Sequence, residues 1–178
     1  MEPDKPMISL HDMVLIAVFA AVLCAAAPFS IAIGPVPLSL ATLVIYLSSG
    51  TLGWKYGTVS VILYITLGAA GLPVFSHFEG GFHKIAGLTG GYIVGYIPLA
   101  LAAGLVFTTS EKRWSCVPGM VTGTVLLYTF GTIWFMLMTK NTLPASLVLT
   151  VLPFLPGDVA KIITAGIIIP KLWAALKR

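Results

Sequence analysis

The sequence predicts an all-helical integral membrane protein, with a single transmembrane domain over residues 1–178 that folds as a bundle of six membrane-spanning helices. Apolar residues make up 58% of the chain and charged residues only 9%, whereas soluble domains carry about 25% charge. The mean hydropathy is +1.01. Long intervals without a charged residue, such as 13–54, provide the length that membrane spans require. The net charge of +4 is small and scattered, which argues against a nucleic-acid-binding surface.

Prolines, glycines and short charged turns divide the apolar intervals into helices. Prolines and glycines at 28–37 end the first span, a turn at 54–57 separates the second from the third, and a charged turn at 111–114 precedes the fifth. The stretch 146–155 is apolar, but it is short and broken by prolines, so it is not predicted to span. The predicted helices cover about 10–27, 38–53, 58–71, 91–108, 117–138 and 158–173.

The first apolar run has an alternative interpretation as a secretory signal peptide. A short charged region precedes it, and Ala25, Ala26 and Ala27 resemble a cleavage site. Further apolar segments follow, so the chain is a membrane protein in either case. We keep this run as the first helix.

The distribution of Lys and Arg predicts that both termini face the cytoplasm. In that orientation the longer irregular segments, 28–37, 72–90 and 139–157, all lie at the outer face, which predicts an outward-facing substrate pocket. Seven positive residues then lie inside and three outside: Lys5, Lys55, Lys112, Arg113, Lys171, Lys177 and Arg178 inside, and Lys84, Lys140 and Lys161 outside.

A glycine-rich interruption at 73–98 is the predicted ligand-binding region. It carries His77 and His83 and a Gly90-Gly91-Tyr92 turn that leads into a helix. Glycines allow a ligand to approach the backbone closely, and a helix start offers free N–H groups. A metal site is the alternative use of the histidines, but their spacing matches no known ligand pattern, and exposed loop residues are the more ordinary explanation.

Asp158 and Lys161 form the strongest pair of candidate functional residues. They are three positions apart and therefore share a helix face, with the acid near the helix N-terminus. Ionisable residues at membrane depth are costly and mark functional sites. In the alternative interpretation, Asp158 only caps the helix and Lys161 extends its ammonium group to the surface.

Small residues recur at every fourth position in several predicted helices, as in Ala17, Ala21 and Ala25, Gly91 and Gly95, and Gly119 and Gly123. Such stripes let helices approach closely. Packing within the bundle and docking to another membrane protein both remain open. The sequence shows no catalytic triad, phosphate-binding loop or paired carboxylates, so we predict that the chain is not an enzyme and needs no cofactor or metal.

Three motifs in their order along the chain resemble the BioY family, the biotin-specific S components of energy-coupling-factor vitamin transporters. They are GLPVF at 71–75, TGGY at 89–92 with Gly95 after it, and FLPGD at 154–158 with Lys161. The resemblance covers nearly the whole chain and includes the Pro-Val-Pro segment at 35–37.

The resemblance implies a six-helix bundle in a prokaryotic plasma membrane, with loops between helices 1–2 and 3–4 over the pocket. It implies a transmembrane coupling subunit that meets the stripe of Ala17, Ala21 and Ala25, and two cytosolic ATPase subunits. It also implies that Asp158 and Lys161 contact the ligand.

Biotin presents a ureido ring with two N–H donors and one strong acceptor, an apolar thioether ring and a carboxylate tail. Our hypothesis is that Asp158 accepts from a ureido N–H, while Lys161 donates to the ureido oxygen or to the carboxylate. The backbone of Gly90 and Gly91 would close on the rings. Tyr92 and Phe75 would supply an apolar wall, and His77 is the remaining predicted contact.

Two other functions stay open at this stage. The chain could be an S component for a different vitamin, or a ligand-free structural subunit of a membrane complex. A membrane enzyme is the least favoured class, because no nucleophile with a base and no metal set is evident.

Overall fold

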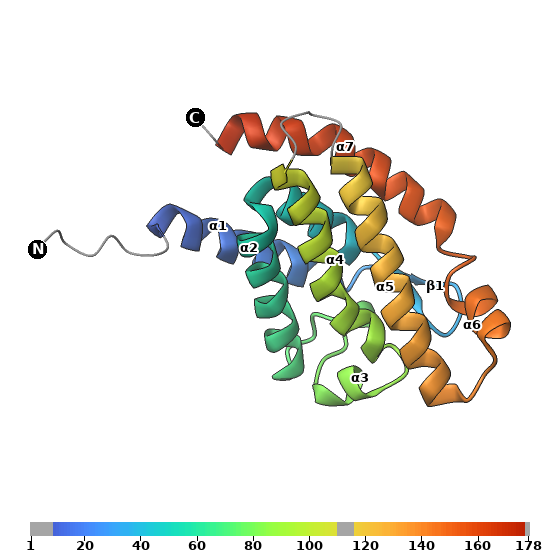
Figure 1. Cartoon of the computed structure of the whole chain (residues 1–178). Helices are drawn as coiled ribbons and strands as arrows, with labels where there is room; N and C mark the ends of the chain where they lie inside the picture. The colour runs from blue at the N-terminus through green and yellow to red at the C-terminus, as the bar shows by residue number, and fades with distance from the viewer. Residues whose placement is uncertain (1–8, 110–115, 177–178) are drawn as a thin grey trace, which may run out of the picture.

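The computed structural model describes residues 9–109 and 116–176, which fold into seven α-helices and one short β-hairpin (Figure 1). The predicted all-helical fold is confirmed. The elements in chain order are α1 (Leu10–Ala26), β1 (Ser30–Ala32), β2 (Pro37–Ser39), α2 (Ala41–Ala69), the 3-10 turn η1 (Ser76–Phe78), α3 (Phe82–Ala86), α4 (Gly90–Thr109), α5 (Cys116–Thr139), α6 (Leu143–Thr150) and α7 (Leu155–Leu176).

The second and third predicted helices are the two halves of α2. Gly53 between them has a φ of 78° and a ψ of −179°, a conformation that glycine adopts readily because it has no Cβ. A Cβ built on Gly57 would lie only 2.7 Å from the Cα of Ser49. A straight helix would separate these positions by about 12 Å along its axis, so the chain doubles back at Gly53. The predicted break is therefore present, with almost no loop.

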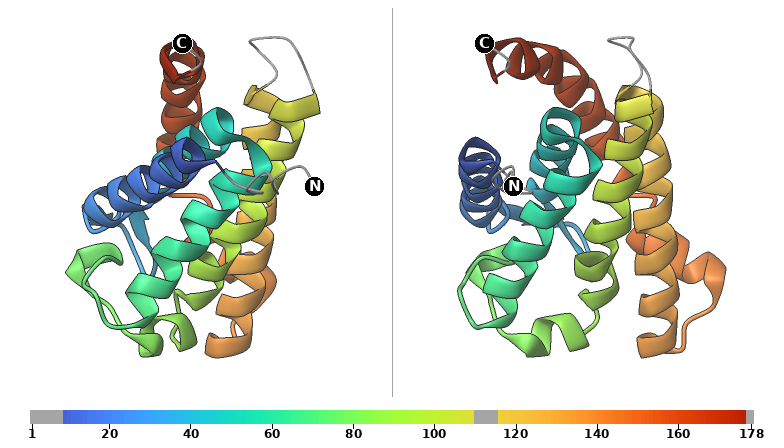
Figure 2. Two further views of the ribbon diagram at one scale, coloured as in Figure 1. Left: turned by 90° about the vertical axis from the view of Figure 1, so that its left-hand side faces the viewer. Right: turned by 60° about the vertical axis from the view of Figure 1, so that its left-hand side comes forward.

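Helices α2, α4 and α5 stand side by side and form the centre of the bundle, while α1 and α7 pack against α2 (Figure 2). Glycines allow the close approach of α4 and α5. A Cβ on Gly123 of α5 would lie 2.8 Å from the carbonyl oxygen of Leu99, and a Cβ on Gly95 of α4 would lie 2.9 Å from Leu127. The two glycine stripes predicted from the sequence therefore serve packing within the bundle.

The segment 28–37, predicted as irregular, contains one strand of an antiparallel hairpin and the start of the other. Ser30 pairs with Ser39 and Ala32 with Pro37. Ser39 then fixes the hairpin to both neighbouring helices. Its hydroxyl donates to the carbonyl oxygen of Ala27 at 2.8 Å and accepts from the N–H of Ala41 at 3.1 Å, at the first residue of α2. The hairpin therefore has a fixed position at the start of α2.

The glycine-rich loop after α2 covers one end of the bundle, together with α3 (Figure 1). It also contacts the segment that leads into the hairpin. The N–H of His77 donates to the carbonyl oxygen of Pro28 at 3.0 Å, and the rings of Phe29 and Phe78 meet edge to face with centroids 5.4 Å apart. The two loops that were predicted to cover the pocket are thus joined to each other.

Most predicted helix boundaries differ from the observed ones by one to three residues. Helix α6 was not predicted, because the prolines around it suggested a break, and at eight residues it is too short to span a membrane. Within the described residues, three helices are long and apolar enough to cross a membrane, namely Gly90–Phe107 of α4, Cys116–Thr139 and Leu155–Leu176, and the shorter Leu10–Ala26 is also apolar.

The six-span count and the cytoplasmic termini stay predictions. The predicted turn at 111–114 lies outside the described residues. So do five of the seven positive residues assigned to the inner face, namely Lys5, Lys112, Arg113, Lys177 and Arg178.

Candidate functional site

The first turns of α7 carry a buried ion pair into the centre of the molecule. Asp158 is 5% exposed and Lys161 is 8% exposed. The lysine Nζ lies 2.9 Å from Oδ1 of the aspartate. Because α7 begins at Leu155, Asp158 lies inside the first turn rather than at the cap, and its own N–H donates to Phe154 at 2.9 Å. The structure therefore contradicts the alternative in which Asp158 only caps the helix and Lys161 extends its ammonium group to the surface.

All three donors of the Lys161 ammonium group have an acceptor in this structure. Nζ donates to the carbonyl oxygen of Ser39 at 2.7 Å, to Oγ1 of Thr42 at 2.9 Å and to Asp158. An ammonium group has three N–H donors. The hairpin and the start of α2 thus supply two of the three partners, so the site depends on elements far from α7 in the sequence.

The carboxylate of Asp158 has partners on both oxygens. The hydroxyl of Tyr128 on α5 donates to Oδ2 at 2.5 Å, while Oδ1 lies 3.5 Å from the Thr42 hydroxyl as well as close to Lys161. A buried charge is tolerated only when it is paired and hydrogen-bonded. In this four-residue network, the contacts with Lys161, Thr42 and Tyr128 meet that requirement and occupy three of the four lone-pair sites of the carboxylate. One site on Oδ2 is left.

Thr42 and Tyr128 were missed by sequence reasoning. A threonine or tyrosine inside an apolar helix is common and normally bonds to its own backbone or borders the membrane interface. No spacing in the sequence relates either residue to Asp158. Polar residues on α2 and α5 can be matched to the charged pair only when it is known that these helices lie next to α7.

Two neighbouring cavities lie in this region, and only the smaller is lined by members of the network. The smaller, of about 40 Å³, contains Asp158 and Lys161 in its wall. The larger, of about 180 Å³, lies between the hairpin turn, the glycine-rich loop and α4. The cavities share four lining residues: Val36, Pro37, Tyr92 and Tyr96. A ligand that reaches from one to the other would therefore pass the two tyrosines.

Three of the predicted contacts line the larger cavity. These are Phe75, His77 and Tyr92. The ring of Phe75 is held edge to face against Tyr64 with centroids 5.7 Å apart, and the hydroxyl of Tyr92 donates to the carbonyl oxygen of Thr150 at 3.2 Å. Both aromatic walls are therefore fixed by contacts within the bundle.

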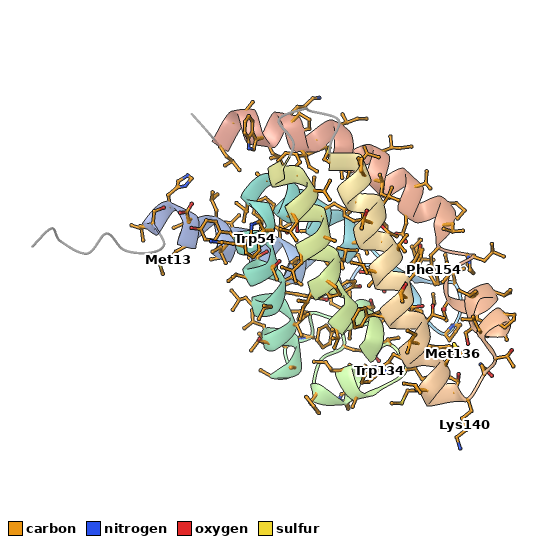
Figure 3. The ribbon with its side chains drawn as sticks, viewed as in Figure 1. Met13, Trp54, Trp134, Met136, Lys140 and Phe154 are labelled. Carbon is orange, nitrogen blue, oxygen red and sulfur yellow. The ribbon has the colours of Figure 1, made fainter. Side chains whose placement is uncertain are left out.

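Gly90 and Gly91 line neither cavity. A Cβ on Gly90 would lie 1.7 Å from the carbonyl oxygen of Ile85, and a Cβ on Gly91 would lie 2.2 Å from Cβ of Trp134. Trp134 lies on α5 near α3 and the start of α4 (Figure 3), and its indole N–H donates to Gly87 at 2.9 Å. The structure gives both glycines a packing role, and their contact with a ligand stays a prediction.

Two further predictions concern residues elsewhere. Ala17, Ala21 and Ala25 are all exposed on α1, so this stripe does not pack inside the bundle. Val14, Val18 and Val22 of the same helix are also largely exposed. As for a metal, the described residues contain no group of three or more His, Cys, Asp or Glu side chains that could hold an ion.

The fold and the buried network define a helical membrane protein with a polar site enclosed in an apolar bundle. The sequence model of the BioY family matches residues 2–178. The chain is 34% identical to the biotin transporter BioY of Thermotoga maritima over 92% of its own length and 96% of that protein. It is 36% identical to the probable biotin transporter BioY of Pyrococcus horikoshii, over 90% and 95% of the two chains. The chain therefore belongs to the BioY family, as its motifs predicted.

A solved structure supports the same relationship. The crystal structure of the S-component for biotin from an ECF-type ABC transporter superposes with a TM-score of 0.81 at 29% identity, and the match covers 90% of this chain and 89% of that one. The fold that positions Asp158 and Lys161 is thus shared with a solved S component.

Proposed function

We propose that this chain is the biotin-capturing S component of an ATP-driven ECF-type vitamin transporter. The observation that carries the proposal is the buried Asp158–Lys161 pair at the wall of a cavity, in a member of the BioY family. A transporter subunit needs a site that desolvates its cargo and satisfies the cargo's polar groups. The pair offers an acceptor and a cation side by side for this purpose.

The ureido ring of biotin suits the smaller cavity. A ureido N–H would donate to the remaining lone pair on Oδ2 of Asp158, and the ureido oxygen would accept from Lys161 in place of one of its present partners. The apolar thioether ring would then lie along the tyrosines shared by the two cavities, Tyr92 and Tyr96. The ligand would extend through both cavities rather than fill one.

The transport role requires partners, because the chain has no ATP-binding motif. In the proposal, the six spans lie in a prokaryotic plasma membrane with both termini inside. The exposed stripe of Ala17, Ala21 and Ala25 on α1 meets the transmembrane coupling subunit. Two cytosolic ATPase subunits complete the complex.

Calorimetric titration of biotin into the detergent-purified chain tests the proposed function. We expect tight binding that weakens at least about tenfold in Asp158→Asn and in Lys161→Ala, because each change leaves a ligand group or the partner residue unpaired inside the protein. Asp12→Asn is the matched control, because Asp12 lies in the first turn of α1 and lines neither cavity. It should bind as tightly as the unchanged chain.

No binding by a well-folded chain would remove the biotin assignment. Binding of a different vitamin in its place would indicate another S component. An Asp158→Asn variant that binds as tightly as the unchanged chain would contradict the role given to the aspartate.

A further inference from the structure

A second ion pair lies at the larger cavity, remote from Asp158 in the sequence. The ammonium group of Lys84 on α3 pairs with the carboxylate of Glu79 in the loop before it, and both side chains line the cavity. Unlike the Asp158–Lys161 pair, this pair is partly open to solvent, with 29% of the Lys84 side chain and 47% of the Glu79 side chain exposed. An exposed pair of this kind is weak and exchanges partners easily.

The deep lysine is poorly placed to bind a carboxylate. Lys161 already donates to Ser39, Thr42 and Asp158, so any new acceptor must displace one of these partners. The adjacent negative charge of Asp158 neutralises it and would repel an anion brought into the small cavity. A ligand with one polar uncharged end and one carboxylate end would therefore place the uncharged end there.

We infer that Lys84 binds the carboxylate of the ligand, and that Glu79 holds Lys84 in place while the site is empty. The inference rests on the proposed function and specifies the other end of the same site. Within the described residues that line the two cavities, the basic side chains are Lys161, Lys84 and His77. Of the two lysines, Lys84 is the one whose present partner is a replaceable carboxylate.

Binding then exchanges one carboxylate for another at Lys84. The carboxylate of the ligand replaces Glu79 at Lys84 or shares the ammonium group with it. In the empty site, Lys84 is paired with Glu79. Because α3 and the loop around it cover the end of the bundle (Figure 1), the same contact would attach the ligand tail to this cover. Glu79 acts as a competitor for Lys84 and reduces the affinity for anionic ligands.

The test compares biotin with biotinamide, in which an uncharged carboxamide of nearly the same shape replaces the carboxylate. Binding of both is measured by calorimetry for the unchanged chain, Lys84→Gln, Lys84→Arg and Glu79→Gln. We expect the unchanged chain to prefer biotin by about three- to tenfold, the range for a partly solvated charge pair. Lys84→Gln should abolish this preference, with its affinity for biotinamide unchanged. Lys84→Arg should keep the preference, and Glu79→Gln should increase it.

Lys140→Gln is the matched control. Lys140 lies at the end of α5, lines neither cavity and points away from the molecule (Figure 3). It should keep the preference of the unchanged chain. Since the Lys84 side chain on α3 is 29% exposed, thermal unfolding of each variant should also match the unchanged chain, which separates a lost contact from a lost fold.

A preference for biotin that survives in Lys84→Gln overturns the inference. If the preference then disappears in His77→Gln, His77 is the residue that binds the carboxylate. A Glu79→Gln variant that weakens the preference overturns the competitor role of Glu79. Failure of the proposed function looks different: the unchanged, folded chain then binds neither biotin nor biotinamide, and the inference fails with it.

Discussion

At the scale of single residues, the site is a network in which each member is held by another. Lys161 fixes one oxygen of Asp158, and the hydroxyl of Tyr128 fixes the other. Thr42 bridges the two by accepting from the lysine while it faces the carboxylate. Pre-arranged polar groups of this kind need little reorganisation when a ligand enters. The orientation of the Asp158 carboxylate is therefore set before binding, and Tyr128 is a positioning residue for it.

We predict that Tyr128→Phe weakens biotin binding by about tenfold, because it leaves one buried carboxylate oxygen without its donor. Titration of biotin by calorimetry measures the effect. Tyr56→Phe is the control, since Tyr56 lines neither cavity, and it should bind as the unchanged chain does. Equal affinity of Tyr128→Phe and the unchanged chain would show that the tyrosine does not orient the aspartate.

At the scale of elements, the close approach of α4 and α5 depends on glycines. The backbone of Leu99 lies where a side chain on Gly123 would have to be, and the ring of Tyr92 lies over Gly131 in the same way. Since Tyr92 forms part of the cavity wall, this helix packing also determines the shape of the site. The contact between α4 and α5 therefore holds the two helices together and also shapes the cavity wall.

We predict that Gly123→Ala lowers the free energy of unfolding by about 1–3 kcal/mol, because the added methyl group forces the two backbones apart. Thermal unfolding in detergent measures this change. Gly166→Ala on α7 is a matched control, since its Cβ would lie 3.7 Å from Val117, an ordinary contact distance. It should leave the midpoint unchanged or raise it. A midpoint for Gly123→Ala equal to that of the control would contradict the packing argument.

At the scale of the whole molecule, the ligand site and the proposed partner surface lie on different parts of the chain. The cavities lie between the hairpin turn, the glycine-rich loop, α4, α5 and the start of α7, whereas the alanine stripe is exposed on α1. Capture of the ligand and assembly with a coupling subunit can therefore be disturbed separately.

We predict that Ala21→Trp abolishes vitamin uptake by cells that contain the partner subunits but leaves biotin binding to the purified chain unchanged. The bulky side chain would prevent close helix packing at the stripe. Ile62→Trp, on an exposed face of α2, is the control and should preserve uptake. Normal uptake with Ala21→Trp would show that this stripe is not a docking surface.

The sequence predicts the parts of this molecule that have a strong local signal. Asp158 and Lys161 stand out because charges are rare in an apolar chain, and the break at Gly53 is marked by a glycine next to interfacial residues. The hairpin was missed because three-residue strands carry no usable periodicity. Thr42 and Tyr128 were missed because their role depends on three helices that meet only in the folded chain.

The roles of the small residues could not be predicted from their spacing either. The stripe on α1 and the glycines of α4 and α5 have the same period of four. The alanines are exposed, however, whereas Gly123 lies against Leu99. Burial distinguishes these two uses, and burial follows from which helices are neighbours. A stripe of small residues on one helix face predicts close packing against another helix, but it does not identify that helix.

Ser39 connects the buried Lys161 to the β1–β2 hairpin. Its hydroxyl bonds to the end of α1 and the start of α2, and its carbonyl oxygen accepts from Lys161. The hydrogen bond from the Lys161 ammonium group to Ser39 therefore also restrains the hairpin. We predict that Lys161→Met, combined with Asp158→Asn to avoid an unpaired charge, speeds amide hydrogen–deuterium exchange at residues 30–39, although none of these is altered. Exchange at α5 should be unaffected, and equal rates in the hairpin would disprove the link. If the link holds, a change at the buried ion pair alters the dynamics of the hairpin through one carbonyl group.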